Sequence, residues 1–383
     1  MKITTLTPRD SFHRIHTYFV GSPYHPDGRT ILYTKFRSLR DSAYVCLMDM
    51  ETGEETVIAE SDCRTYHNGA WAYFCDGGKK VLYQKVYDWV SPDKKNNVVV
   101  CHDLATGRET SFNGTIGLYF GNIGERYIEV DADFPVDEQE KMAIYTRNID
   151  GTDKRIVATV HDMLAVHPNA KELRNSKATF RLGAQISPDN KRVVLFLVGR
   201  ANTSIRDYII CDIDGSNPEF HGRIGGHILW HPDGRRILAH VRNSGSSFLE
   251  AVRGPDHEDL RHAFVGSYDT GNRRMTLLGD YRLPTDCAPH LAPSPDGTKV
   301  VFDLNRPDEM SILLYDFRKK EMRLLCTEKR DLNVEEKDKE RMALLHGRKH
   351  YDVNAHPVFS HDSRRIVYNS CPDGQVTLRQ ITL

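Results

Sequence analysis

The stretch GGHILWHPDGRRILAHV (225–241) joins a tight turn to a strand, and the chain repeats this combination. In the turn His-Pro-Asp-Gly (231–234), proline presets φ, aspartate bonds its own backbone and glycine accepts a positive φ. The apolar residues that follow alternate with other residues, as in a half-buried β-strand. The segment therefore predicts a hairpin in which one strand enters the turn and a second leaves it.

Related segments recur along the 383 residues and bring the number of units to seven. The other six are HPDGRTILYTK (25–35), CDGGKKVLYQK (75–85), GNIGERYIEV (121–130), SPDNKRVVLFL (187–197), SPDGTKVVFDL (294–304) and SHDSRRIVYNS (360–370). Most units carry a further strand that ends in its own turn, such as VVVCHDLATGRE (98–109). Four short strands per unit, repeated seven times, predict an all-β chain folded as a seven-bladed β-propeller.

The seventh unit ends with its third strand, TLRQITL (377–383), and MKITTLT (1–7) at the opposite end can supply the fourth. We expect this N-terminal strand to join the last blade and close the ring, which removes an exposed edge. Residues 1–383 are then one propeller domain. Two stretches exceed a minimal blade, at about 153–180 and 327–349, and are expected to be insertions, the second of them helical.

Composition narrows the classes of function. The formal net charge of −1 gives no reason to expect nucleic-acid binding or a basic membrane-binding surface. The sequence has no apolar run of 18 residues, and its first residues lack the apolar core of a signal peptide, so we expect a cytoplasmic protein without a membrane partner. The eight cysteines form no C-x-x-C pair, which favours reduced, buried thiols. The sequence specifies no oligomeric state.

Histidines occur in register with the turns. In a propeller, the strand that leads into the turn is the innermost one, so equal offsets mark equivalent positions around the central channel. His227, His290 and His356 each lie six residues before the aspartate of their turn. Three successive blades therefore direct imidazoles to one arc of the channel mouth. The same offset in the first, second and fourth units holds small residues that leave room for a ligand: Gly21, Ala70 and Gly183.

Converging neutral imidazoles suit a borderline divalent metal, and they also suit proton abstraction near neutral pH. Asn354 lies two residues before His356 on the same strand face, and His350 precedes it in the connecting loop. Either side chain could complete a coordination sphere. Three further histidines lie within the turns, on the opposite face, where we expect them to be solvated: His25, His231 and His361.

Arginines are expected on the histidine face. The connection between a blade's second and third strands emerges on this face, and in the fourth unit it is VGRANTSIRDY (198–208). It carries Arg200 and Arg206, and the equivalent connection of the first unit carries Arg40. Because a guanidinium binds a carboxylate through two parallel hydrogen bonds, these residues predict a basic cup for an acidic ligand.

Four segments together resemble the oligogalacturonate lyase family of polysaccharide lyases. They are FHRIHTYF (12–19), GGHILWHPDG (225–234), APHLAPSPDG (288–297) and NAHPVFSHD (354–362). Members of that family are seven-bladed propellers that cleave uronate-containing oligosaccharides by β-elimination. The resemblance extends over most of the chain, and it implies an acidic oligosaccharide as the substrate.

The resemblance also implies roles for individual residues. The first of the three histidines is the base in that family, and the other two belong to a metal site that commonly holds manganese. His227 would then be the base, while His290 and His356 would bind a divalent cation, Mn²⁺ first and Ca²⁺ or another ion as alternatives. An arginine of the fourth blade assists in the family, and Arg206 lies within one position of it. From the first matching segment, Arg14 and Tyr18 would bind the substrate.

This sequence departs from the family pattern beside the third histidine. The family's His-Pro-His-Pro reads Asn354-Ala355-His356-Pro357 here, and the family's glutamine ligand aligns nearest to Tyr351, with His350 adjacent. These departures concern the ligand set, and they leave both Asn354 and His350 as candidate ligands.

The implied chemistry agrees with the residue types. Removing the proton at C5 of a uronate adds charge to an already negative carboxylate, so a cation must absorb that charge. A histidine-bound metal and Arg206 would do this, and their positive charge would keep His227 neutral. The alternative is a non-catalytic, TolB-like propeller that binds proteins, although a scaffold has no need of histidines in register. An accessory propeller of a hydrolase is disfavoured because the sequence contains no G-x-S-x-G nucleophile segment.

Overall fold

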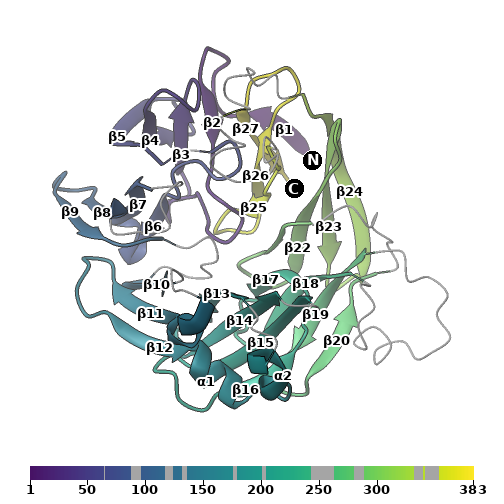
Figure 1. Ribbon diagram of the computed structural model, residues 1–383. Coiled ribbons are helices and arrows are strands. Elements are labelled where there is room, and N and C mark those ends of the chain that lie inside the picture. Colours follow the sequence, from purple (N-terminus) through teal and green to yellow (C-terminus); the bar gives the residue numbers. More distant parts are fainter. Residues whose placement is uncertain are drawn as a thin grey trace.

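The computed structural model describes residues 1–63, 65–87, 96–116, 124–131, 136–175, 179–200, 204–242, 263–279, 289–331, 340 and 353–383. Within these ranges the strands form seven antiparallel sheets arranged around a ring (Figure 1). The predicted seven-bladed β-propeller is confirmed.

The blades follow the order of the chain, and in blades one to six each sheet is ordered as its strands occur in sequence. Blade one contains β2 (His13–Ile15), β3 (Thr30–Phe36), β4 (Ala43–Asp49) and β5 (Glu55–Ser61). Blade two contains β6 (Tyr73–Cys75), β7 (Lys80–Val86), β8 (Val98–Asp103) and β9 (Glu109–Asn113), with the short helix η1 (Asp76–Gly78) in its first turn. Blade three has three strands in the described ranges, β10 (Arg126–Asp131), β11 (Ala143–Asn148) and β12 (Arg155–Thr159), with η3 (Val136–Lys141) between the first two.

The second half of the ring is built in the same way. Blade four contains β13 (Thr179–Ile186), β14 (Arg192–Arg200), β15 (Ser204–Asp212) and β16 (Glu219–Gly222). Blade five contains β17 (Gly226–Trp230), β18 (Arg236–Arg242), β19 (Ala263–Asp269) and β20 (Arg274–Leu277). Blade six contains β21 (Leu291–Pro293), β22 (Lys299–Asn305), β23 (Glu309–Asp316) and β24 (Glu321–Lys329). Blade seven contains β25 (Val358–Phe359), β26 (Arg365–Ser370), β27 (Thr377–Thr382) and β1 (Lys2–Thr5).

The N-terminal strand closes the ring as predicted. β1 pairs antiparallel with β27, with Lys2 opposite Thr382 and Thr5 opposite Arg379. It becomes the outermost strand of blade seven, beside the C-terminal strand (Figure 1). The backbone groups along the outer side of β27 are thereby paired within the molecule.

The two predicted insertions have different outcomes. The range 153–180 includes β12, which belongs to blade three, and then two short helices, α1 (Val160–Ala165) and α2 (Ala170–Asn175). A capping box between Thr159 and Asp162 starts α1, and His167 connects the helical segment to β15 through a 3.0 Å contact with Asp207. In the range 327–349, β24 extends to Lys329; of the remaining residues, only 330, 331 and 340 are among those described.

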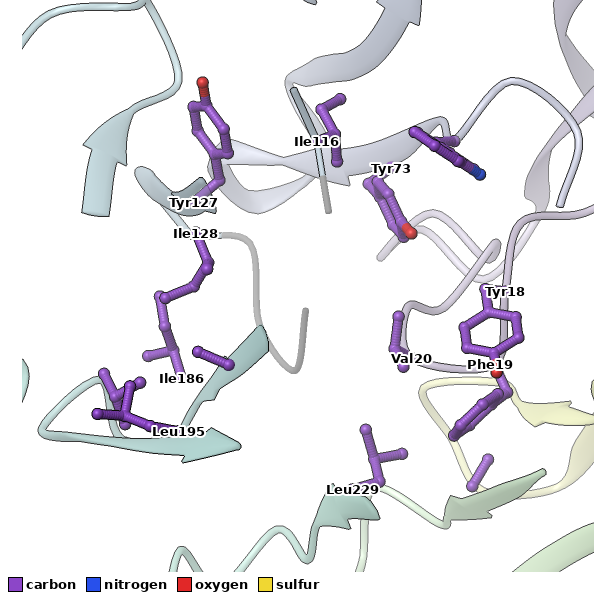
Figure 2. Close-up of a cluster of buried hydrophobic side chains, with 14 of the residues drawn as sticks. Tyr18, Phe19, Val20, Tyr73, Ile116, Tyr127, Ile128, Ile186, Leu195 and Leu229 are labelled. Carbon is purple, nitrogen blue, oxygen red and sulfur yellow. The ribbon is translucent and has the colours of Figure 1, made fainter. Parts of the chain in front are cut away.

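A buried apolar cluster connects the blades and the segment that follows β2. It includes Tyr18, Phe19, Leu195 and Leu229, which Figure 2 shows with other members of the cluster. Tyr18 is 4% exposed and Phe19 is 1% exposed. Aromatic side chains of a connecting segment therefore form part of the hydrophobic core, which fixes the position of this segment.

Turns of neighbouring blades are joined by histidines. The Nε2 atoms of His25, His231 and His361 contact the carbonyl oxygens of Gly78, Gly297 and Tyr24, at 3.1, 3.0 and 2.9 Å. Because a carbonyl oxygen only accepts, Nε2 is the donor in each pair. The expected solvation is wrong for His231, which is 2% exposed, because its ring packs under the next turn. Gly78 has φ +92°, and a Cβ there would lie 2.4 Å from the His25 ring, so this turn requires glycine.

Two composition-based expectations can be compared with the described residues. The cysteines in these ranges are free thiols, and all of them except Cys326 are buried. No helix found there combines the length and apolar character needed to cross a bilayer.

Candidate active site

Three imidazoles converge at the centre of the ring. One ligand nitrogen from each of His67, His290 and His356 lies within 4.8 Å of the others. These residues precede the innermost strands of blades two, six and seven, namely β6, β21 and β25. His290 is 2% exposed and His356 is fully buried. The structure thus brings together two of the predicted ligands and adds His67.

The hydrogen bonding of His356 indicates whether these residues fit a metal ion. Both of its ring nitrogens are buried and have no hydrogen-bond partner among the described residues. An unpaired buried polar atom typically costs about 1–3 kcal/mol, so this imidazole lacks a partner it should have. Burial, and then the neighbouring histidines, hold the pKa of His356 well below its ordinary value, so the ring stays neutral with a lone pair available. The donor set therefore fits a divalent cation.

His290 is oriented by a buried carboxylate. Its Nδ1 lies 3.1 Å from each carboxylate oxygen of Asp303, which is fully buried on β22. Burial opposes ionisation of Asp303, but the adjacent His290 and a hydrogen bond from the Asn305 side chain outweigh this effect and lower the pKa of the carboxyl group. Nδ1 is consequently the protonated nitrogen, and Nε2 of His290 carries the lone pair.

His227 lies against this group as a separate imidazole. Its ring stacks on that of His290, with centroids 4.5 Å apart. Its Nδ1 is 3.3 Å from the carbonyl oxygen of Pro289, and because this oxygen only accepts, Nδ1 is the donor. The remaining nitrogen, Nε2, has the lone pair that a general base needs.

The backbone is unusual at both of the register positions on blades five and seven. His227 and His356 each have φ +45°, in the left-handed region that residues other than glycine adopt at a cost. At His227 the pairing of β17 with β18 changes register between Gly226 and Leu229, which is a bulge. Bulges re-aim side chains, and here the bulge turns His227 out of the regular strand alternation.

Tyr18 packs among the imidazoles. Its ring centroid lies 4.8 Å from that of His356, 5.4 Å from that of His290 and 5.5 Å from that of His67. Phe19 follows it and contacts His290 with centroids 5.1 Å apart (Figure 2 shows both aromatic rings). Tyr18, one of the two residues of this segment predicted to bind the substrate, thus lies at the histidine cluster.

Two predicted arginines lie outside this cluster. Arg14 is 2% exposed, and its guanidinium bonds Asp10 at 2.8 Å and Glu55 at 3.1 Å. It would have to release these carboxylates to bind a substrate carboxylate. Arg40 is exposed in the connection between β3 and β4, where its backbone N–H donates to Ser38 Oγ at 3.1 Å.

The structure describes the remaining predicted residues only in part. Arg200 ends β14, and Arg206 lies on β15 opposite Val198, but the side chains of both are outside the described part. His350 also lies outside the described residues. Asn354 is beside the cluster, with its Nδ2 3.5 Å from His67 Nδ1 and its Oδ1 3.4 Å from Arg330.

His67 was missed because it does not follow the repeat. The register position of blade two is Ala70, and His67 lies three residues before it in TYHNGAW (65–71). A search at a fixed offset from the turn passes over this residue. The available signal was a histidine three residues before the small residue at the register position of blade two.

Comparisons with known proteins support the fold. Neither a family model nor a curated protein matches this sequence. An oligogalacturonate lyase in complex with manganese has 18% identity and a TM-score of 0.64, over 100% of this chain and 93% of the other. The oligogalacturonate lyase of Vibrio parahaemolyticus has 14% identity and a TM-score of 0.66, over 99% and 93%. Hydrazine synthase of Kuenenia stuttgartiensis has 15% identity and a TM-score of 0.52, over 95% and 94%.

At sequence identities of 14–18%, the similarity between this chain and these structures concerns the fold alone. The seven-bladed architecture that the sequence resemblance implied is the one found. This chain shares its propeller fold with the oligogalacturonate lyases, the family that its sequence resembles.

Proposed function

We propose that the protein is a lyase that cleaves uronate-containing oligosaccharides by β-elimination. The observation that carries the proposal is the set of three imidazoles within 4.8 Å, with a fourth imidazole stacked on one of them. A cation site beside a neutral base is the arrangement that proton removal next to a carboxylate requires. The fold shared with oligogalacturonate lyases supports the same chemistry.

His67, His290 and His356 would hold the divalent cation. Manganese is the first candidate, because one of the similar structures is an oligogalacturonate lyase in complex with manganese. When bound, the cation supplies positive charge that neutralises the uronate carboxylate and lowers the energy of the carbanion-like transition state. Asn354 and His350 remain candidates for an additional ligand.

The protein's own residues would move the proton. His227 takes the C5 proton on Nε2, because its Nδ1 is engaged with the Pro289 carbonyl. The C–H electron pair forms the C4–C5 double bond, and the bond between C4 and the glycosidic oxygen breaks. Arg206 binds the carboxylate, and Tyr18 contacts the sugar ring. The leaving oxygen takes a proton from water or from a tyrosine.

The test is the ultraviolet absorbance of the unsaturated uronate product. A panel of oligogalacturonates and oligosaccharides with other uronate linkages, including rhamnose-linked glucuronate, is incubated with the protein and Mn²⁺. We expect absorbance to rise with at least one substrate, to stop rising after chelation and to recover when Mn²⁺ is restored. A flat signal with every substrate, together with tight binding to another protein, would support the non-catalytic scaffold instead.

A further inference from the structure

We propose that Asp303 is a positioning residue, which sets the tautomer of His290 and the separation of His290 from His356. This inference rests on the proposed metal centre. Asp303 lies on β22 of blade six and is 0% exposed. A carboxylate in such a place must be paired, because an isolated buried charge is very costly.

Asp303 bonds residues of two neighbouring blades. Its Oδ1 accepts the backbone N–H of His290 at 2.8 Å, and its Oδ2 accepts the backbone N–H of His356 at 3.0 Å. Both oxygens also lie 3.1 Å from His290 Nδ1. Hydrogen bonds to an ionised acceptor are roughly twice as strong as neutral ones. One carboxylate therefore fixes the backbone of both ligands and the ring of one.

The ring contact determines which nitrogen of His290 faces the cluster. The carboxylate accepts the Nδ1 proton, so the lone pair resides on Nε2. Histidine ligands in metal proteins commonly donate their second N–H to a carboxylate, which orients the ring and raises its basicity. His290 has this arrangement before any ion is bound.

Asn305 provides a comparison on the same face of β22. Side chains two residues apart in a strand point to the same side, and Asn305 Oδ1 accepts the backbone N–H of Ala355 at 3.2 Å. Asn305 thus also connects blade six to blade seven through the backbone. Asn305 also hydrogen-bonds the carboxylate of Asp303. The described contacts give it no bond to the imidazole of His290 or His356, so its loss would weaken the support of Asp303 and leave the carboxylate beside His290 in place.

The experiment compares Asp303→Asn with Asn305→Ala. Mn²⁺ affinity is measured by titration calorimetry, and the tautomer of His290 is measured by ¹⁵N NMR of the metal-free protein. We expect Asp303→Asn to weaken Mn²⁺ binding by about 10–100-fold, as is typical for outer partners of ligands, and to remove the preference for the Nδ1–H tautomer. Asn305→Ala should keep the Nδ1–H tautomer of His290 and should weaken Mn²⁺ binding less than Asp303→Asn does, because it removes one hydrogen bond to Asp303 and leaves the carboxylate itself in place.

Several results would overturn the inference. One is an Nε2–H tautomer of His290 in the unmodified protein, a measurement that needs no variant. Another is an unchanged tautomer and affinity in Asp303→Asn, and a third is an equal loss of affinity in Asn305→Ala, which would make Asp303 a structural link between blades. Failure of the unmodified protein to bind Mn²⁺ would remove the metal centre of the proposed function, while the tautomer would still report on Asp303.

Discussion

His227 and His290 stack with their ring centroids 4.5 Å apart and their planes inclined by 28°. Their Nδ1 atoms bond different acceptors, the Pro289 carbonyl and the Asp303 carboxylate. In the neutral form of each ring, Nε2 is therefore the nitrogen with the lone pair. The two rings in contact can perform two tasks, because positive charge placed at one of them disfavours protonation of the other.

If His227 is the base and His290 is a metal ligand, His227→Asn should reduce turnover without loss of the metal. Asparagine is chosen because it tolerates the φ of +45° at this position better than most residues. Loss of the base should reduce turnover by about 10²–10⁴-fold. Metal content, measured by elemental analysis, should not change. Loss of the metal in this variant would instead make His227 a ligand.

A second pair of variants distinguishes His67 from Asn354 as the ligand that completes the metal site. His67→Ala should weaken Mn²⁺ binding by more than the roughly 10–100-fold that follows loss of an outer partner, since it removes a coordinating nitrogen. Asn354→Ala should have a smaller effect, because its Oδ1 already faces Arg330. Calorimetric titration of both variants provides the comparison. A greater loss of affinity in Asn354→Ala would identify Asn354 as the ligand.

Substitution of the turn histidines should lower the free energy of unfolding without changing metal binding at the histidine cluster. His231→Ala leaves the Gly297 carbonyl without its donor and should lower the free energy of unfolding by about 1–3 kcal/mol. His361→Ala removes a similar bond at an exposed position and should cost less. Urea denaturation measures both, and Mn²⁺ affinity should remain constant. A change in affinity would show that the turns and the centre are coupled.

Acid should destabilise the protein through His221. Its side chain is 2% exposed, and Nδ1 lies 3.0 Å from the Tyr268 hydroxyl. Burial, and then Arg273, lower its pKa from the ordinary 6.5 to about 4. The unfolded chain therefore binds more protons between these two values, and the stabilisation present above pH 6.5 is lost as the pH falls towards 4.

The matched variant for this effect is His221→Gln. Its melting temperature should fall less between pH 7 and pH 4.5 than that of the unmodified protein, measured by differential scanning fluorimetry. Parallel curves for the two proteins would contradict the prediction.

The sequence predicted the features that depend on the repeat. The turn and strand pattern identified the blades, and an equal offset from the turn placed His290 and His356 together, because register in a closed ring is equivalent to position. His67 could not be found in this way, since it reaches the centre from a segment before its blade. Asp303 is one of three polar residues in the strand KVVFDLN (299–305), and two of its partners are backbone N–H groups, which carry no residue-type signal.

The burial of His231 was misjudged for a related reason. The hairpin pattern describes one blade at a time, whereas His231 finds its acceptor on the next blade. Contacts between blades depend on how the ring packs, and a turn motif taken alone does not contain that information.

The pairing of β1 with β27 has a consequence for the histidine cluster. His356 belongs to the blade that this pair completes, and His67 lies beyond blade one on the other side of the seam. An ion bound by both residues would connect the two sides of this seam. Separation of β1 from β27 and release of the ion would then be coupled, and chelation would lower the energy barrier to opening the seam.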